Sequence, residues 1–110
     1  MLPESHTAIL ERRIPVADRI ETEPYEVSWA RELIAFLYLT VPLKAELALK
    51  SYISADGMRW IEDRNITLKI GEKGTALKLQ HFGGWIKFTI STDRSGTFNS
   101  EMDLYVHVKS

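Results

Sequence analysis

The chain has 110 residues, of which 45% are hydrophobic and 26% are charged, so we expect one ordinary soluble domain. Fourteen Lys and Arg nearly balance fifteen Asp and Glu, and the resulting net charge of −1 argues against a nucleic-acid partner or an anionic membrane surface. The chain lacks cysteine, which excludes disulfides and cysteine nucleophiles, and its longest uncharged run has eleven residues, too short for membrane insertion as a helix of about 20.

The first 24 residues differ from the rest because they contain three of the four prolines and no aromatic residue. They show no basic or apolar leader typical of secretion, so we expect synthesis in the cytoplasm and a role there or in a particle such as a virion. We predict an extended N-terminal arm or edge strands over residues 1–24, followed by a domain over residues 25–110. As an assembly arm, the segment would contact a neighbour through Ile9, Ile14, Val16 and Ile20.

From Tyr25 onward, apolar and polar residues alternate with the period of two that marks half-buried strands. The clearest case is Glu101 to Lys109, where apolar residues at even positions predict one buried face. The same pattern predicts strands over residues 44–54, 66–70, 75–80 and 85–92. Leu33 to Thr40 is apolar on both faces, as expected of a central strand covered on each side or a strand at a contact.

Residues 41–50 are rich in good helix formers after Pro42, so a helix competes with a strand there. We favour the strand because the alternation continues into the Asp56-Gly57 turn. Further turns are predicted at residues 71–74, 83–84 and 93–96. Short strands between such regular turns predict an all-β fold: an antiparallel β-sandwich of about eight strands, jelly-roll or immunoglobulin-like.

The pattern Ser54-x-Asp56-Gly57-x-x-Trp60 follows an alternating strand. The Ser54 and Asp56 side chains are suited to accept hydrogen bonds from backbone amides across the turn. Gly57 is suited to the turn position whose backbone conformation is strained for other residues. This segment resembles the hairpin of discoidin-type domains and of phage tail and appendage modules, and the run from Phe82 to Phe88 looks like the strand beside it. The resemblance implies a β-sandwich that binds or assembles and seldom catalyses.

Chemical motifs are scarce. No two of the three histidines stand at metal-ligand spacing, and the sequence has no nucleophile elbow or phosphate-binding glycine loop. We therefore predict no catalytic residue, no cofactor and no metal site. Asp93, Ser95, Asn99 and Glu101 bring oxygen ligands near one loop, but we favour a plain polar hairpin there over a calcium site.

The aromatic residues are more informative. We expect Trp29, Phe36, Trp60, Phe82 and Phe88 in the core, whereas Tyr52, Trp85 and Tyr105 fall on outward positions. If their strands are neighbours, these three form an exposed face that serves as a subunit interface, a cover of the sheet edge, or a platform for sugar rings. We predict a non-enzymatic structural subunit whose partner is itself or another subunit, best described as a phage-type virion component, tail or capsid-associated. The alternative is a carbohydrate- or cell-surface-binding module with a glycan as partner.

Overall fold

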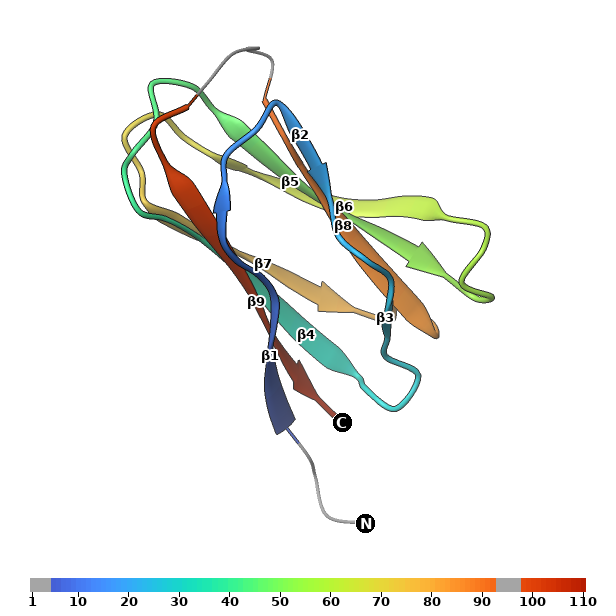
Figure 1. Ribbon diagram of the computed structural model, residues 1–110. Helices are drawn as coiled ribbons and strands as arrows, with labels where there is room; N and C mark the ends of the chain where they lie inside the picture. Colours follow the sequence, from blue (N-terminus) through green and yellow to red (C-terminus); the bar gives the residue numbers. More distant parts are fainter. Residues whose placement is uncertain (1–4, 93–97) are drawn as a thin grey trace.

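Two antiparallel β-sheets packed face to face make up residues 5–92 and 98–110, the part of the chain that the computed structural model describes (Figure 1). The strands are β1 (Ser5–Pro15), β2 (Arg19–Glu21), β3 (Tyr25–Glu26), β4 (Glu32–Leu39), β5 (Leu47–Ser54), β6 (Ile61–Leu68), β7 (Gly74–Gln80), β8 (Trp85–Ser91) and β9 (Glu101–Lys109). The predicted antiparallel β-sandwich is confirmed. The turn predicted at residues 93–96, together with Asp93 and Ser95, lies outside the described residues.

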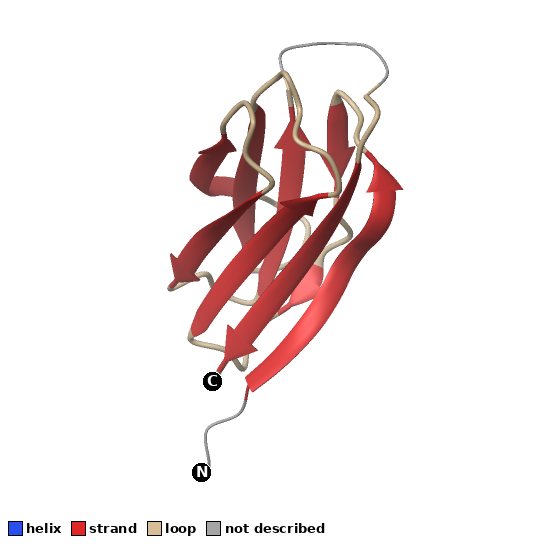
Figure 2. Ribbon diagram, turned by 90° about the vertical axis from the view of Figure 1, so that its left-hand side faces the viewer, coloured by secondary structure: helices blue, strands red, loops and turns tan. Residues whose placement is uncertain are grey.

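The first sheet has the strand order β1-β9-β4-β7 and faces the viewer in Figure 2. The second sheet has the order β2-β8-β5-β6, and β3 also pairs with β8. Sequence neighbours are therefore often in different sheets, as in sandwiches whose chain crosses between layers. This distribution decides which outward side chains share a face.

The core lies between the sheets and is built by the predicted alternation. All four even-numbered residues from Met102 to Val108 on β9 are fully buried, and so are Ile86, Phe88 and Ile90 on β8. The strand predicted over residues 66–70 would place Ile70 on the same inward side as Ile66 and Leu68, and this is wrong. β6 ends at Leu68, the chain turns at Gly71 with φ 86°, and Ile70 is exposed.

Residues 47–50 form a strand, and the described residues contain no helix. β5 is paired on both sides, with β8 and β6, so its backbone hydrogen bonds are satisfied by the sheet despite its good helix propensity. Residues 41–46 precede the strand as a loop that buries Leu43 and Ala45.

The described part of the N-terminal segment belongs to both sheets. β1 pairs with β9 along the edge of the first sheet, and β2 pairs with β8 in the second. Val16 is buried in the core, and Ile14 and Ile20 pack against it. Of the four residues predicted to contact a neighbour as an assembly arm, Ile9 alone is exposed.

Candidate functional site

The outer surface of the first sheet carries a cluster of apolar side chains in the middle of β4, β9 and β1. In register across the three strands, Phe36 lies beside Tyr105, and Tyr105 beside Ile9. Ile34 and Tyr38 flank Phe36 on β4. We call these five residues the aromatic face. Tyr38 is 45% exposed and Ile9 is 48% exposed, so part of this apolar surface is open to water.

The rings of the aromatic face form an ordered cluster. The ring centroids of Phe36 and Tyr38 are 6.2 Å apart with nearly parallel planes, and Tyr105 meets Tyr38 edge-on with centroids 5.9 Å apart. Thr7 and His107 complete a shallow hollow of about 400 Å³ beside the three rings. The Thr7 hydroxyl and the His107 Nδ1 are hydrogen-bonded at 2.9 Å, which holds the imidazole at the rim.

The outer surface of the second sheet is more polar, although Tyr52 and Trp60 lie on it and Ile61 on its edge strand β6 is 68% exposed. Its outward positions on β5, β6 and β8 are mostly polar or small, including Lys50, Asn65, Thr67, Lys87 and Ser91. An antiparallel sheet with one solvated face normally shows this apolar-in, polar-out alternation. The aromatic face departs from it on a sheet that nothing covers within the described chain. The first sheet is therefore the stronger candidate for a contact surface.

The predicted face of Tyr52, Trp85 and Tyr105 is divided between the two sheets. Tyr52 on β5 and Trp85 on β8 lie on neighbouring strands of the second sheet, whereas Tyr105 lies on β9 in the first. Trp85 packs against the β5–β6 turn: a Cβ added at Gly57 would lie 3.2 Å from its ring. Three roles were predicted for that face. The contact with the turn best fits the role in which Trp85 covers the sheet edge of its own domain.

The core prediction for the aromatic residues needs two corrections, at Phe36 and at Trp60. Phe82 and Phe88 are buried as expected, and Trp29 packs at the margin of the core. Phe36 points outward, because the strict period of β4 assigns its inward positions to the odd-numbered residues from Leu33 to Leu39. Trp60 is half-buried on the outer side of the second sheet, where the Lys87 Nζ lies 4.5 Å from its ring centroid.

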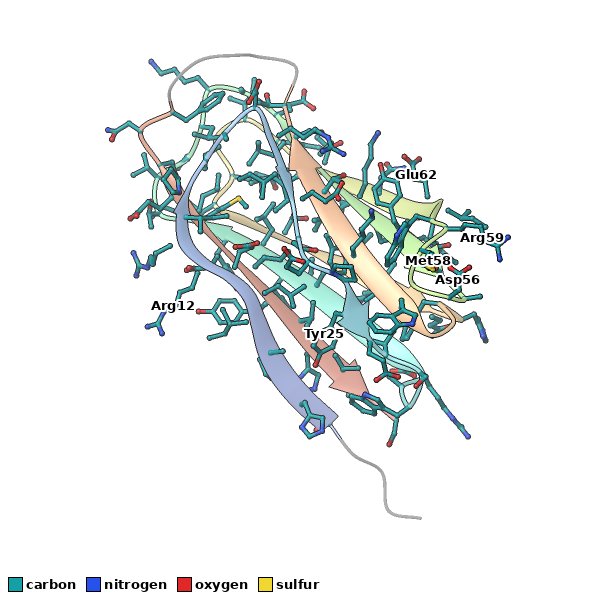
Figure 3. The ribbon with its side chains drawn as sticks, turned by 45° about the vertical axis from the view of Figure 1, so that its right-hand side comes forward. Arg12, Tyr25, Asp56, Met58, Arg59 and Glu62 are labelled. Atoms are coloured by element: carbon teal, nitrogen blue, oxygen red, sulfur yellow. The ribbon has the colours of Figure 1, made fainter. Side chains whose placement is uncertain are left out.

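The β5–β6 turn shows the hydrogen bonds expected of its motif. The Gly57 amide donates to Ser54 Oγ at 2.8 Å, and Gly57 has φ 79°. The amides of Arg59 and Met58 each donate to Asp56 Oδ1 at 2.9 Å, and these bonds hold the pKa of Asp56 well below its usual range. In Figure 3, Asp56, Met58 and Arg59 lie together at the tip of this hairpin, on the side of the molecule away from Arg12 of β1.

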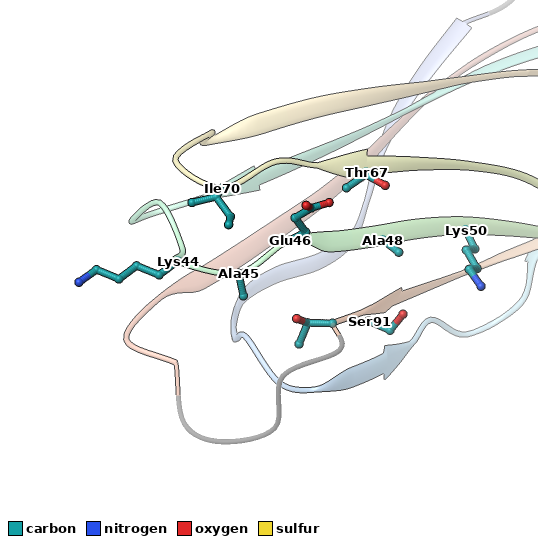
Figure 4. A pocket seen from close by; sticks show the side chains of 9 residues that line it. Lys44, Ala45, Glu46, Ala48, Lys50, Thr67, Ile70 and Ser91 are labelled. Carbon is teal, nitrogen blue, oxygen red and sulfur yellow. The ribbon is translucent and has the colours of Figure 1, made fainter.

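Two further hollows lie outside the aromatic face. The larger, of about 680 Å³, is an open groove over the outer side of β5, with Ala48 and Thr67 on its floor and Lys44, Glu46 and Lys50 around it (Figure 4). The other, of about 520 Å³, lies beside the hairpin between Ile53 and Phe82, where Asp56 is paired with Arg59 at 2.9 Å. Ser54, Asp56 and His81 all line this second hollow, and the Ser54 hydroxyl donates to Asp56 Oδ1 at 3.0 Å. The same Ser54 Oγ accepts the Asp56 and Gly57 amides, so the hydroxyl and the carboxylate are both engaged in the turn.

The described residues hold no group of three His, Asp or Glu side chains positioned as metal ligands. Within the same residues, no helix has the length and apolar character needed to cross a bilayer. The aromatic face gathers five apolar side chains on one surface, with the hydrogen-bonded pair of Thr7 and His107 beside its rings.

Comparisons with known proteins bear on the fold. No protein-family model matches the chain, and no curated protein matches it. Among solved structures, it is similar to the PBSX exported protein XepA, with a TM-score of 0.68 at 15% identity over 94% of this chain and 36% of that one. It is also similar to a chain of infectious bursal disease virus Gx strain, with a TM-score of 0.63 at 13% identity over 97% of this chain and 32% of that one.

A third similar structure is the SPBc2 prophage-derived protein YomS, with a TM-score of 0.61 at 11% identity over 100% of this chain and 96% of that one. The chain thus spans about a third of the first two proteins and nearly the whole of the third. At these identities the likeness shows the fold, a β-sandwich shared with proteins of phage and viral origin.

Proposed function

We propose that this protein is a non-enzymatic structural subunit of a larger assembly, specifically a phage-type virion component, tail or capsid-associated. The observation that carries the proposal is the aromatic face, an apolar and aromatic surface on the outside of the first sheet. Tyr and other aromatic residues are enriched at subunit contacts because they bury a large area at a small entropic cost. The fold likeness to phage and viral proteins supports the particular kind of assembly.

The position of the face supports the same role. β4 lies inside the first sheet, between β9 and β7, and its inner side is fully covered by the core. Its outer side offers Ile34, Phe36 and Tyr38 to whatever packs on the sheet. A neighbouring subunit on this surface would remove the remaining apolar area from water, which is the main favourable term in association.

The test is whether the chain is found in particles. A tagged full-length chain would be produced in its natural host while particles form, and the lysate separated on a density gradient. We expect the wild type and the control Tyr52→Ser in the particle fraction. The double variant Phe36→Ser/Tyr38→Ser should stay at the top of the gradient with the unassembled proteins. Circular dichroism should show that all three chains are folded. A wild-type chain found only at the top while particles are made would overturn the proposal.

A second candidate function, a carbohydrate- or cell-surface-binding module, is favoured by the hollow beside Tyr38 and Tyr105. Aromatic rings bordered by the hydroxyl of Thr7 and the imidazole of His107 offer both a stacking surface and polar contacts to a sugar ring. Saturable binding on a glycan array that is lost in Tyr105→Ser, together with absence of the chain from particles, would support this function over the first.

A further inference from the structure

The outward side chains of β9 follow a self-complementary order. They are, along the strand, Glu101, Asp103, Tyr105, His107 and Lys109. Two acids thus stand on one side of the central tyrosine, and an imidazole and an ammonium stand on the other. Tyr105 belongs to the aromatic face, so this charge pattern crosses the apolar centre of the first sheet.

Contacts within the chain hold two of these groups in place. The Arg13 amide donates to Asp103 Oδ1 at 2.7 Å, and Arg13 Nε lies 4.0 Å from Asp103 Oδ2. The His107 ring is held through Nδ1 by Thr7. Asp103 and His107 are therefore held in place at the surface of the sheet, with Arg13 beside Asp103 and with Glu32 of β4 in register with Lys109.

We propose that a second copy of this chain occupies the aromatic face, in a two-fold dimer with the two first sheets face to face. The two-fold axis lies between the sheets and runs across the strands through Tyr105 and Phe36. It sets each Lys109 against the partner copy's glutamate at position 101, and each His107 against the partner copy's aspartate at position 103. On β4 the same axis sets Ile34 against the tyrosine at position 38 of the other copy. This proposal rests on the proposed function in assigning the aromatic face to assembly, and it adds the identity of the partner.

The size and geometry of the sheet suit this arrangement. Four strands about 4.8 Å apart and nine residues of about 3.4 Å each give a surface of roughly 19 by 30 Å, or about 570 Å² per copy. This is below the roughly 800 Å² per partner of a standard interface and in the range of weaker, reversible contacts. Facing sheets cross at about 30°, which offsets the ends of the two β9 strands by roughly 7 Å. The long Lys109 and Glu101 side chains span such an offset.

Two of the sheet edges, β1 and β6, are poorer candidates for contact between copies. β1, at one edge of the first sheet, changes register twice between Ile9 and Ile14, and Arg13 there has φ 52°. Such irregularities interrupt the ladder that an added strand would need. β6, at the edge of the second sheet, carries the charged run Glu62, Asp63 and Arg64. Pairing between copies through the β1 or β6 edge is therefore disfavoured.

Charge exchange at the two ends of β9 tests the proposal. Lys109→Glu sets acid against acid at both symmetry-related contacts, and Glu101→Lys sets base against base. We expect each single variant to dimerise about tenfold more weakly than the wild type, because two contacts change from attractive to repulsive. An equimolar mixture of the two variants should regain near-wild-type affinity as a heterodimer, since positions 101 and 109 then carry opposite charges at both symmetry-related contacts. Lys69→Glu, beyond the end of β6 on the other sheet, is the matched control and should dimerise like the wild type.

The measurement is sedimentation velocity from low micromolar to near-millimolar protein, with native mass spectrometry of a mixture in which one variant carries ¹⁵N. Single variants that dimerise like the wild type, or a mixture no tighter than its components, would overturn the two-fold arrangement. A wild type that stays monomeric yet enters particles would overturn the dimer and leave the proposed function standing. A wild type that dimerises but never enters particles would overturn the proposed function and leave the dimer standing.

Discussion

The contact between Gly57 and Trp85 allows a stability prediction worked from two glycines. Gly57 and Gly71 both have positive φ, 79° and 86°, so an alanine at either site would occupy the left-handed region at a cost of about 1–2 kcal/mol. A Cβ at Gly71 meets nothing within 4 Å, whereas a Cβ at Gly57 lies 3.2 Å from the Trp85 ring. Forcing extra volume into a packed site costs about 1–3 kcal/mol more.

We therefore expect Gly57→Ala to destabilise the fold by about 2–5 kcal/mol and Gly71→Ala by only about 1–2 kcal/mol. Urea unfolding followed by tryptophan fluorescence would measure both, and the glycine-to-alanine effect on the unfolded chain cancels in the comparison. In a Trp85→Ala background the two substitutions should cost the same, because the crowded ring is gone. Equal costs in the wild-type background would refute the packing of Trp85 on the turn and would return Trp85 to the candidates for an outward contact.

Three further predictions concern the core, the edge and the hairpin. Phe88→Ala should cost about 3–5 kcal/mol in urea unfolding, because Phe88 is fully buried, and a loss below about 1 kcal/mol would contradict its inward position. Deleting residues 1–15 removes β1 and uncovers the edge of β9, so we expect a lower melting temperature with aggregation in light scattering; unchanged melting would show that β1 adds nothing to the sandwich. The folded-state pKa of Asp56 is depressed, so its carboxylate stabilises the fold above its ordinary pKa of 3.8 and loses that contribution as pH falls below it. The stability gap between the wild type and Asp56→Asn should therefore narrow on acidification, and a gap that is constant between pH 7 and about pH 2 would contradict the network around Asp56.

The sequence predicted the fold because alternation reports burial directly. On β9 every even-numbered residue from Met102 to Val108 is inward, as its period of two required. The Asp56-Gly57 turn was equally readable, since few residues other than glycine accept the positive φ found there. Both signals depend only on residues that are close together in the chain, so a single sequence is enough to detect them.

The candidate site was harder to predict because it depends on which strands share a sheet. Tyr105 and Tyr52 are both outward, and nothing local says that β9 pairs with β4 while β5 pairs with β8. Phe36 was assigned to the core by its residue type, although the period of β4 makes it outward. The signal that points to the aromatic face is the run from Leu33 to Thr40, which is apolar at outward as well as inward positions. From this run we predicted either a central strand covered on each side or a strand at a contact.

The pairing of the first strand with the last has a mechanical consequence. Ser5 lies opposite Lys109, so the two ends of the described chain leave the molecule from the same corner (Figure 1). A pull that separates these ends would load the Ser5–Lys109 pair first and then each following pair of the β1–β9 ladder in turn. Strands that open one pair at a time never share the force among their hydrogen bonds, so the sandwich would resist such a pull weakly. The same β1–β9 ladder would be loaded in shear, with many hydrogen bonds sharing the force, if the pull ran along the strands from Ser5 to Glu101.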